Sequence, residues 1–441
     1  MITSNLLSDL RGLLPETEIE ESGNPNHLLG NDGDIVIYPT SEEEISQILS
    51  YANENNKKAV ISGMGTKRGY GGVEEAADIL LSLTNFKGIV EHTVGDMTVT
   101  VKPGTPFKEL QEHLAKHDQK IALDPPFSDF ATIGGIIAAN ESGPKRLGYG
   151  SARDLVIGLK VVYPNGEVIR TGGKVVKNVA GYDMNKLFIG SMGTLGVLSE
   201  ITLKLRPIPK HESLVLLSFE ESSLENIKQL AVKILDSLIE PVSLQLLNPS
   251  AAEEMTGKSN YTLAIAFEDV ESSVKYQEDF IKNLQPENTS FTLLQEEEAK
   301  EFWQKFSNLA PNGIMTITGN ETEAALKVGV KNLDVFKVIG ECELLEEGFN
   351  VKVISHGGLG HGLSEVIIKG ASENVLAAIH SLRESVKELK GYAIVKYLPL
   401  SMRQTMNVWG DTPSYFFLLE GIKTKIDPAK TLNHKRFLGG L

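Results

Sequence analysis

Three glycine-rich segments follow one another in the N-terminal half of the chain. They are Ser62-Gly63-Met64-Gly65-Thr66, Ala131-Thr132-Ile133-Gly134-Gly135 and Gly190-Ser191-Met192-Gly193-Thr194-Leu195-Gly196. Glycine has no Cβ and tolerates positive φ, so a glycine-rich loop lets backbone N–H groups approach a phosphate closely. In this order the three segments predict a cradle for the pyrophosphate of a dinucleotide.

The first segment alone would not support that prediction. A tight turn after a strand often contains two glycines, and the spacing departs from the Rossmann pattern G-x-G-x-x-G because Arg68 stands in place of the third glycine. The prediction therefore depends on the three segments together.

Size, charge and cysteine content exclude several other classes. A chain of 441 residues with 41% hydrophobic residues can fill the cores of two or three domains. A formal net charge of −15 would repel a nucleic acid. Cys342 is the only cysteine, which rules out an internal disulfide and an iron–sulfur cluster held by this chain alone.

The N-terminal segment and the hydropathy pattern bear on localisation. The segment lacks a basic region and a long apolar core, so we expect no signal peptide. Its leucines predict a short amphipathic helix instead; they are Leu6, Leu7, Leu10, Leu13 and Leu14. No apolar run reaches the roughly 18 residues of a spanning helix. We expect a cytoplasmic protein that reaches a membrane only through a partner.

The alternation of strands and helices changes near residues 205–211. Before that break, a strand at 34–38, a helix after Thr40-Ser41 and a strand at 57–61 predict a β-α-β unit. Further strands are expected at 79–83, 89–91, 98–101, 155–163, 167–171 and 196–205. After the break, strands alternate with charged amphipathic helices in two similar halves. That pattern predicts a ferredoxin-like antiparallel sheet with helices on one face.

Taken together, the segments resemble the FAD-binding oxidoreductases of the vanillyl-alcohol-oxidase and p-cresol-methylhydroxylase (PCMH) type. The similar stretches are 62–72, 124–126, 131–143, 149–154, 177–183 and 190–200. The run 172–183 is most similar to the FAD-binding E subunit of bacterial glycolate oxidase, and 425–433 is similar to the family's closing segment. The resemblance implies an α+β fold: a two-part PCMH-type FAD-binding domain over 1–210, to which 416–441 returns, and an α+β cap domain over 211–415.

The resemblance also implies which residues bind FAD. They are Ser62, Gly63, Met64, Gly65, Thr66, Gly69, Tyr70, Thr132, Ile133, Gly134, Gly135, Asn140, Gly143 and Ile201, the last through a backbone contact at the adenine end. Lys177, Asn178, Gly181 and Asp183 are expected to brace the fold. Some family members tether the flavin through a histidine in the first loop. This loop has Met64 and no histidine, so non-covalent FAD is expected.

The cap departs from the pattern of related 2-hydroxyacid dehydrogenases. Those proteins hold a divalent metal with two histidines seven residues apart, whereas here Leu363 stands seven residues after His356, and His361 stands five residues after it. No metal site is predicted on this basis. Arg153, Arg146 and Arg403 are candidates to hold a substrate carboxylate, and His356 is a further catalytic candidate.

The expected function follows from the resemblance. It is an FAD-dependent oxidoreductase acting on CH–OH groups: the FAD-binding subunit of a glycolate (2-hydroxyacid) oxidase complex. Electrons would leave for a partner iron–sulfur subunit or a quinone, beside a catalytic flavin subunit. Two alternatives stay open. One is a stand-alone FAD-linked dehydrogenase of another 2-hydroxyacid such as D-lactate, and the other is a non-catalytic flavin-fold scaffold.

Overall fold

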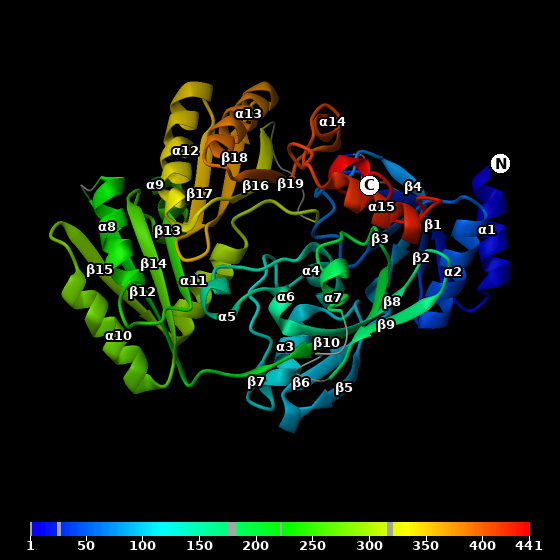
Figure 1. Ribbon diagram of the computed structural model, residues 1–441, viewed down its shortest axis with the longest axis horizontal. Helices are drawn as coiled ribbons and strands as arrows, with labels where there is room; N and C mark the ends of the chain where they lie inside the picture. The colour runs from blue at the N-terminus through cyan, green and yellow to red at the C-terminus, as the bar shows by residue number, and fades with distance from the viewer. Residues whose placement is uncertain (1, 24–27, 175–181, 221–222, 315–320) are drawn as a thin grey trace.

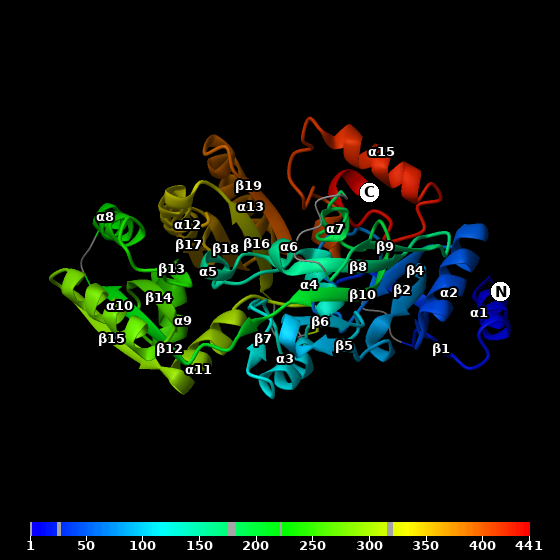
Figure 2. The same cartoon turned by 60° about the horizontal axis from the view of Figure 1, so that its bottom comes forward.

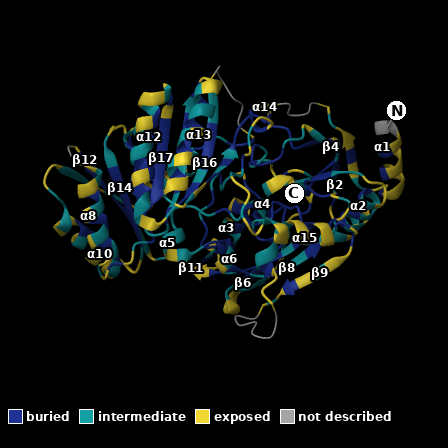
Figure 3. Cartoon of the chain, turned by 45° about the horizontal axis from the view of Figure 1, so that its top comes forward, coloured by how far each residue is buried: buried dark blue, intermediate teal, exposed yellow. Residues whose placement is uncertain are grey.

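The computed structural model describes residues 2–23, 28–174, 182–220, 223–314 and 321–441. Two bodies lie side by side (Figure 1): one contains the N-terminal half and the C-terminal tail, and the other is built on an eight-stranded sheet. The strands are largely buried, whereas helices such as α12 (Val335–Phe349) and α13 (Ser372–Glu388) expose their outer faces (Figure 3).

A four-stranded sheet with the order β1-β2-β4-β3 begins the first body. Its elements are α1 (Ile2–Leu13), β1 (Glu18–Glu21), β2 (Asp32–Tyr38), α2 (Glu42–Glu54), β3 (Ala59–Ser62) and β4 (Ala76–Ser82). Helix α2 begins with a capping box in which the Ser41 hydroxyl accepts from the Glu44 N–H at 3.2 Å. Strands β2 and β3 both pair with β4 in parallel, which confirms the predicted β-α-β unit.

A second sheet of five antiparallel strands has the order β5-β6-β10-β8-β9. The strands are β5 (Ile89–Thr93), β6 (Thr98–Val101), β8 (Val156–Val162), β9 (Val168–Gly172) and β10 (Val197–Lys204). The helices beside it are α3 (Phe107–Ala115), α4 (Ile133–Ala139), α6 (Ala152–Leu155) and α7 (Asn185–Phe188). Helix α5 (Arg146–Tyr149) instead contacts the second body, where Gly148 N–H donates to Val242 O at 3.1 Å. A small ribbon pairs β7 (Gln119–Lys120) with β11 (Arg206–Pro207). Side chains of α3 and α4, including Leu110 and Ile136, pack into the core of this sheet.

The eight-stranded sheet of the second body is antiparallel throughout and has the order β15-β12-β14-β13-β17-β18-β16-β19. Its first half contains β12 (His211–Phe219), α8 (Leu224–Leu235), β13 (Ser243–Leu247), α9 (Pro249–Thr256), β14 (Tyr261–Asp269), α10 (Glu271–Leu284) and β15 (Thr289–Gln295). Helix α11 (Glu296–Ser307) follows, and the second half contains β16 (Thr322–Gly329), α12, β17 (Lys352–Gly358), β18 (Leu363–Gly370), α13 and β19 (Tyr392–Tyr397). Each half has the ferredoxin-like strand order, as expected.

Helices cover both faces of this sheet, contrary to the expectation of one face. Along β12, Val215 and Leu217 point to a core shared with α8 and α10. Leu214 and Leu216 point to the opposite core, which contains α9, α11 and Phe127 from the first body. The period of two buries both faces of the strand. The second face therefore meets the first body, and pockets form where they meet.

The C-terminal tail lies against the first body (Figure 2). After α14 (Leu400–Arg403) and α15 (Phe416–Ile426), Leu432 forms a parallel bridge with Ala59 at the start of β3. The buried Asp427 accepts hydrogen bonds from the N–H groups of Thr431 and Leu432, both at 2.9 Å, and so shapes the turn. Within the described residues, no helix is both long and apolar enough to cross a membrane.

Candidate functional site

The structure brings the three glycine-rich segments together around α4. An added Cβ at Gly63 would overlap Oγ1 of Thr132, so the first segment lies directly on the second. Thr132 caps α4, its hydroxyl accepting from the Gly135 N–H at 3.3 Å. The third segment bonds to the same helix, because Met192 N–H donates to Ala138 O at 2.9 Å.

These segments line one pocket, which we call the glycine pocket. Its lining residues are Asn31, Ile61, Ser62, Gly63, Met64, Gly65, Thr66, Lys67, Arg68, Thr132, Gly135, Ala138, Ala139, Met192 and Arg436. Backbone N–H groups without neighbouring Cβ atoms and three cationic side chains suit a bound pyrophosphate. Burial lowers the pKa of Arg436 to about 10, so this guanidinium stays charged at neutral pH.

Two buried polar side chains hold the backbone around this pocket. Arg403 donates to the carbonyl oxygens of Gly71 and Gly72 in the loop that follows the first segment, and also to those of Leu29 and Leu398. Asn433 accepts from Ile61 N–H at 2.9 Å and donates to Met192 O at 2.6 Å. The first and third segments are therefore fixed by the C-terminal part of the chain.

Four other predicted cofactor residues, Gly69, Tyr70, Asn140 and Gly143, are not part of the lining of the glycine pocket. Buried Tyr70 stacks on Trp409 with ring centroids 5.2 Å apart, and an added Cβ at Gly69 would lie 2.8 Å from Tyr397. Asn140 ends α4 with φ 49°, and its buried Oδ1 has no hydrogen-bond partner among the described residues. Gly143 N–H donates to Asp124 at 3.0 Å.

Three further predicted cofactor residues also lie outside the lining of the glycine pocket. An added Cβ at Gly134 would lie 2.6 Å from Cβ of Pro103, and Ile133 is fully buried next to it. Ile201 is fully buried in the middle of β10, outside the glycine pocket, so its backbone contact with the adenine end stays a prediction. Lys177, Asn178 and Gly181 lie outside the described residues.

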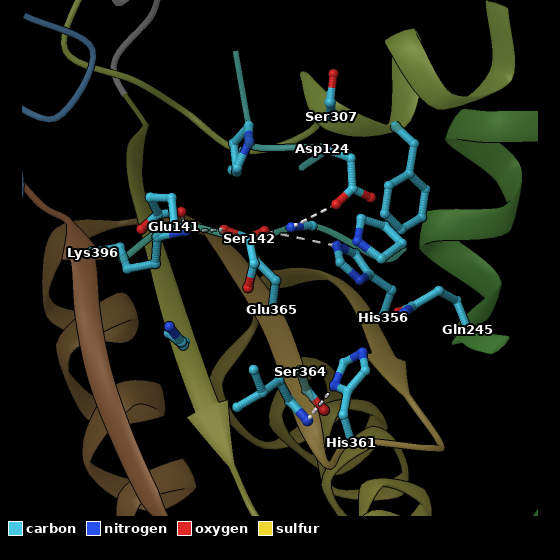
Figure 4. A pocket seen from close by; sticks show the side chains of 17 residues that line it. Asp124, Glu141, Ser142, Gln245, Ser307, His356, His361, Ser364, Glu365 and Lys396 are labelled. Atoms are coloured by element: carbon cyan, nitrogen blue, oxygen red, sulfur yellow. Dashed lines mark hydrogen bonds and ion pairs between the residues drawn. The ribbon is translucent and has the colours of Figure 1, made fainter. Parts of the chain in front are cut away.

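A second pocket lies where the eight-stranded sheet meets the first body (Figure 4). We call it the polar pocket; it has a cavity volume of about 70 Å³ and is partly open to solvent. Its lining residues are Asp124, Pro126, Glu141, Ser142, Gly143, Pro144, Gln245, Phe306, Ser307, Ala310, Lys327, His356, His361, Leu363, Ser364, Glu365 and Lys396.

Two lysines, Lys327 and Lys396, and three carboxyl groups, those of Asp124, Glu141 and Glu365, line the polar pocket. The Lys396 ammonium lies 3.0 Å from a carboxylate oxygen of Glu141 and 3.3 Å from one of Glu365. Burial lowers the pKa of Lys396, but the two carboxylates raise it further, so the net direction is upward. Burial lowers the pKa of Lys67 to about 8 and also lowers that of Lys327. An added anion would relieve the cost of keeping these lysines charged.

Two histidines face the polar pocket in the neutral form. Burial lowers the pKa of His356 to about 4, although Glu365 opposes the shift, and burial together with Arg146 lowers that of His361 to about 4. Nε2 of His356 lies 3.8 Å from a carboxylate oxygen of Glu365, and within the part of the chain that the structure describes its buried Nδ1 has no hydrogen-bond partner. Nδ1 of His361 accepts from Leu363 N–H at 3.2 Å, which leaves the proton on Nε2.

A third cavity lies between the two pockets. It is lined by Thr66 and Lys67, which also line the glycine pocket, and by Glu141, Glu365 and Lys396, which also line the polar pocket. The two pockets are therefore close neighbours in the structure.

The arginine candidates have other contacts. Arg403 is fully buried and donates to the four backbone carbonyls described above, which makes it a clamp of the loop. Arg153 donates to Lys186 O at 3.0 Å, and Arg146 donates to the Ser142 hydroxyl at 3.1 Å. Among the predicted catalytic candidates, only His356 lines the polar pocket.

Comparisons with known proteins agree with this geometry. A family model described as "FAD binding domain" matches residues 33–172. D-lactate dehydrogenase (cytochrome), mitochondrial, of Arabidopsis thaliana is 32% identical over 323 residues, which cover 69% of this chain and 56% of that protein. Glycolate oxidase subunit GlcE of Escherichia coli (strain K12) is 35% identical over 169 residues, which cover 38% of this chain and 47% of that protein. The matches thus span about half the length of these relatives.

A solved structure supplies the fold. p-Cresol methylhydroxylase superposes with a TM-score of 0.76 at 15% identity, over 98% of this chain and 96% of that one. The chain therefore contains an FAD-binding domain and has the fold of p-cresol methylhydroxylase, and FAD is its cofactor. The predicted resemblance, α+β fold and cofactor are confirmed. The described residues that line the glycine pocket include no histidine or cysteine, in keeping with non-covalent FAD.

Several residues of the site could not be found from the sequence. Arg436 donates to Lys67 O at 3.1 Å inside the glycine pocket, although it stands more than 360 positions away in the chain. Glu141, Lys327, Glu365 and Lys396 come from separate elements, and no spacing pattern connects them. A sequence signal existed only for Lys67, which directly follows the first glycine segment.

Proposed function

We propose that this chain oxidises a small 2-hydroxyacid to the 2-oxoacid and acts as the FAD-binding subunit of a glycolate oxidase type of complex. The observation that carries the proposal is a cavity that shares lining residues with both the glycine pocket and a pocket lined by two lysines and two neutral histidines. The names of the relatives, a D-lactate dehydrogenase and a glycolate oxidase subunit, support this substrate class.

The side chains of the polar pocket have distinct roles in this proposal. Lys327, with Lys67 nearby, binds the substrate carboxylate. His356 accepts the hydroxyl proton at Nδ1, and Glu365 orients the ring from the Nε2 side at 3.8 Å. FAD, when bound, supplies the acceptor for the hydride equivalent that leaves the hydroxyl-bearing carbon.

The electrons then pass to a partner iron–sulfur subunit or to a quinone. The one thiol of the chain, Cys342, is buried at a pKa that burial raises to about 12, so it takes no part in electron transfer. A stand-alone D-lactate dehydrogenase is the second candidate, favoured by the match over 69% of this chain. Turnover of D-lactate with a dye by the purified chain alone would support this candidate.

Substitution of the proposed base tests the assignment. We expect His356→Gln to lower kcat for the better of glycolate and D-lactate by about 10²- to 10⁴-fold, the usual contribution of a general base. His380→Gln, a change at an exposed histidine on α13, should leave kcat unchanged. Equal activity of the two variants would refute the role of His356.

A further inference from the structure

A cluster of three histidines lies outside both pockets. His92 lies on β5, His113 lies in the last turn of α3, and His117 follows in the turn that ends this helix. One ring nitrogen of each residue lies within 4.8 Å of those of the other two. None of the three lines the glycine pocket or the polar pocket.

The closest pair of ring nitrogens has the spacing of metal ligands. Nδ1 of His92 lies 3.3 Å from Nε2 of His113. Two imidazole nitrogens bound to one tetrahedral Zn²⁺ at 2.0–2.1 Å are about 3.3–3.4 Å apart. His117 is exposed, so its ring can turn toward this pair without disturbing the core.

A neighbouring amide determines which nitrogen of His92 can bind a metal ion. Gln119 is buried, and its Nε2 donates to Val94 O at 2.8 Å, which points Oε1 toward His92. Oε1 lies 2.9 Å from Nε2 of His92, so that nitrogen carries the proton, and Nδ1 presents its lone pair to His113. Such an outer hydrogen bond is typical of histidines that bind metals.

We propose that His92, His113 and His117 bind one divalent transition-metal ion, Zn²⁺, with water at the fourth position. Three imidazoles suit zinc, and two of them come from positions i and i+4 at the end of one helix. The ion would join β5 to α3 in the FAD-binding body. The site is separate from His356 and His361 and does not depend on the proposed substrate.

Zinc binding to the untagged FAD-loaded chain tests the proposal. Isothermal titration with ZnCl₂ should show one saturable site per chain, lost in His117→Asn and in His113→Asn. His117 is exposed, so its variant should fold normally. Gln119→Leu should weaken binding by about 10- to 100-fold, as expected for loss of an outer-shell partner.

Two control variants separate this site from other histidines. His380→Asn on α13 and His361→Asn in the polar pocket should both bind zinc like the parent chain. X-ray absorption at the zinc edge should show nitrogen ligands at about 2.0–2.1 Å. Absence of a saturable site, or binding that survives His113→Asn and His117→Asn, would overturn the proposal, and loss of binding in His361→Asn would place the ion in the polar pocket instead.

Discussion

At the residue scale, Lys327 and Lys396 line the same pocket but have different roles. Lys396 neutralises the buried Glu141, which is 3% exposed. Removing one partner of a buried pair leaves an uncompensated charge, so Lys396→Met should lower the free energy of unfolding by about 3–5 kcal/mol. Burial lowers the pKa of Lys327, which means that burial disfavours its charged form. Lys327→Met should therefore leave the free energy of unfolding unchanged.

The same pair of variants separates binding from stability. Lys327→Met should raise KM for the 2-hydroxyacid about 10- to 100-fold, because a charge-assisted hydrogen bond to the carboxylate is lost. Urea unfolding and steady-state kinetics of both variants measure the two effects. An unchanged KM for Lys327→Met would remove this lysine from the substrate site.

The buried histidines predict a loss of stability in acid. The pKa values of His356 and His361 are about 4 in the folded chain against an ordinary value of 6.5, so the unfolded chain binds these protons more tightly. Their contribution is complete above pH 6.5 and falls as the pH drops toward 4, by up to roughly 3 kcal/mol for each histidine.

Comparison with a variant isolates this effect. Burial raises the pKa of Asp124 to about 6, so its protonation stabilises the folded chain in acid, opposite to the effect of the histidines. The other charged groups that face the histidines are Glu365, Lys396, Lys327 and Arg146. Urea unfolding at pH 7.5 and pH 5 should therefore be compared between the parent chain and His361→Gln. The variant should lose less stability on acidification. Equal losses would mean that His361 titrates normally.

At the element scale, the contact between the first glycine loop and α4 shapes the glycine pocket. Gly63→Ala would place a Cβ against the Thr132 hydroxyl that caps α4, so the loop must move away. We expect weaker FAD binding, by about tenfold or more, since the N–H groups of the loop lose their close approach. Gly95→Ala is the matched control, because nothing lies within 4 Å of an added Cβ there. Fluorescence titration with FAD measures both, and equal affinities would contradict the assignment of this loop.

Local signals were sufficient to predict most elements from the sequence. Thr40-Ser41, for example, marked the start of α2, where Ser41 is the N-cap. The sheet faces were harder, because β12 is buried on both sides and its hydrophobic run gives no alternation. The packing of α9 and α11 on the second face follows from contacts with Phe127, which are remote in sequence.

At the scale of the whole molecule, the site is assembled where two bodies meet. The glycine segments could be predicted from the sequence, because each is a short continuous stretch whose backbone makes several of the contacts. The pairs Lys396–Glu141 and Arg436–Lys67 join residues about 255 and 369 positions apart, and only the fold brings them together. The metal-binding geometry of His92 with His113 likewise depends on the packing of α3 beside β5.

The central claim is that the cradle holds FAD next to a pocket for a 2-hydroxyacid. Anaerobic titration of the purified FAD-loaded chain with glycolate and D-lactate, followed by the visible absorption of the flavin, tests it most directly. We expect at least one of the two acids to bleach the bound flavin, and His356→Gln to retain the colour far longer. A chain that binds FAD but keeps its full flavin absorption with both acids would contradict the account.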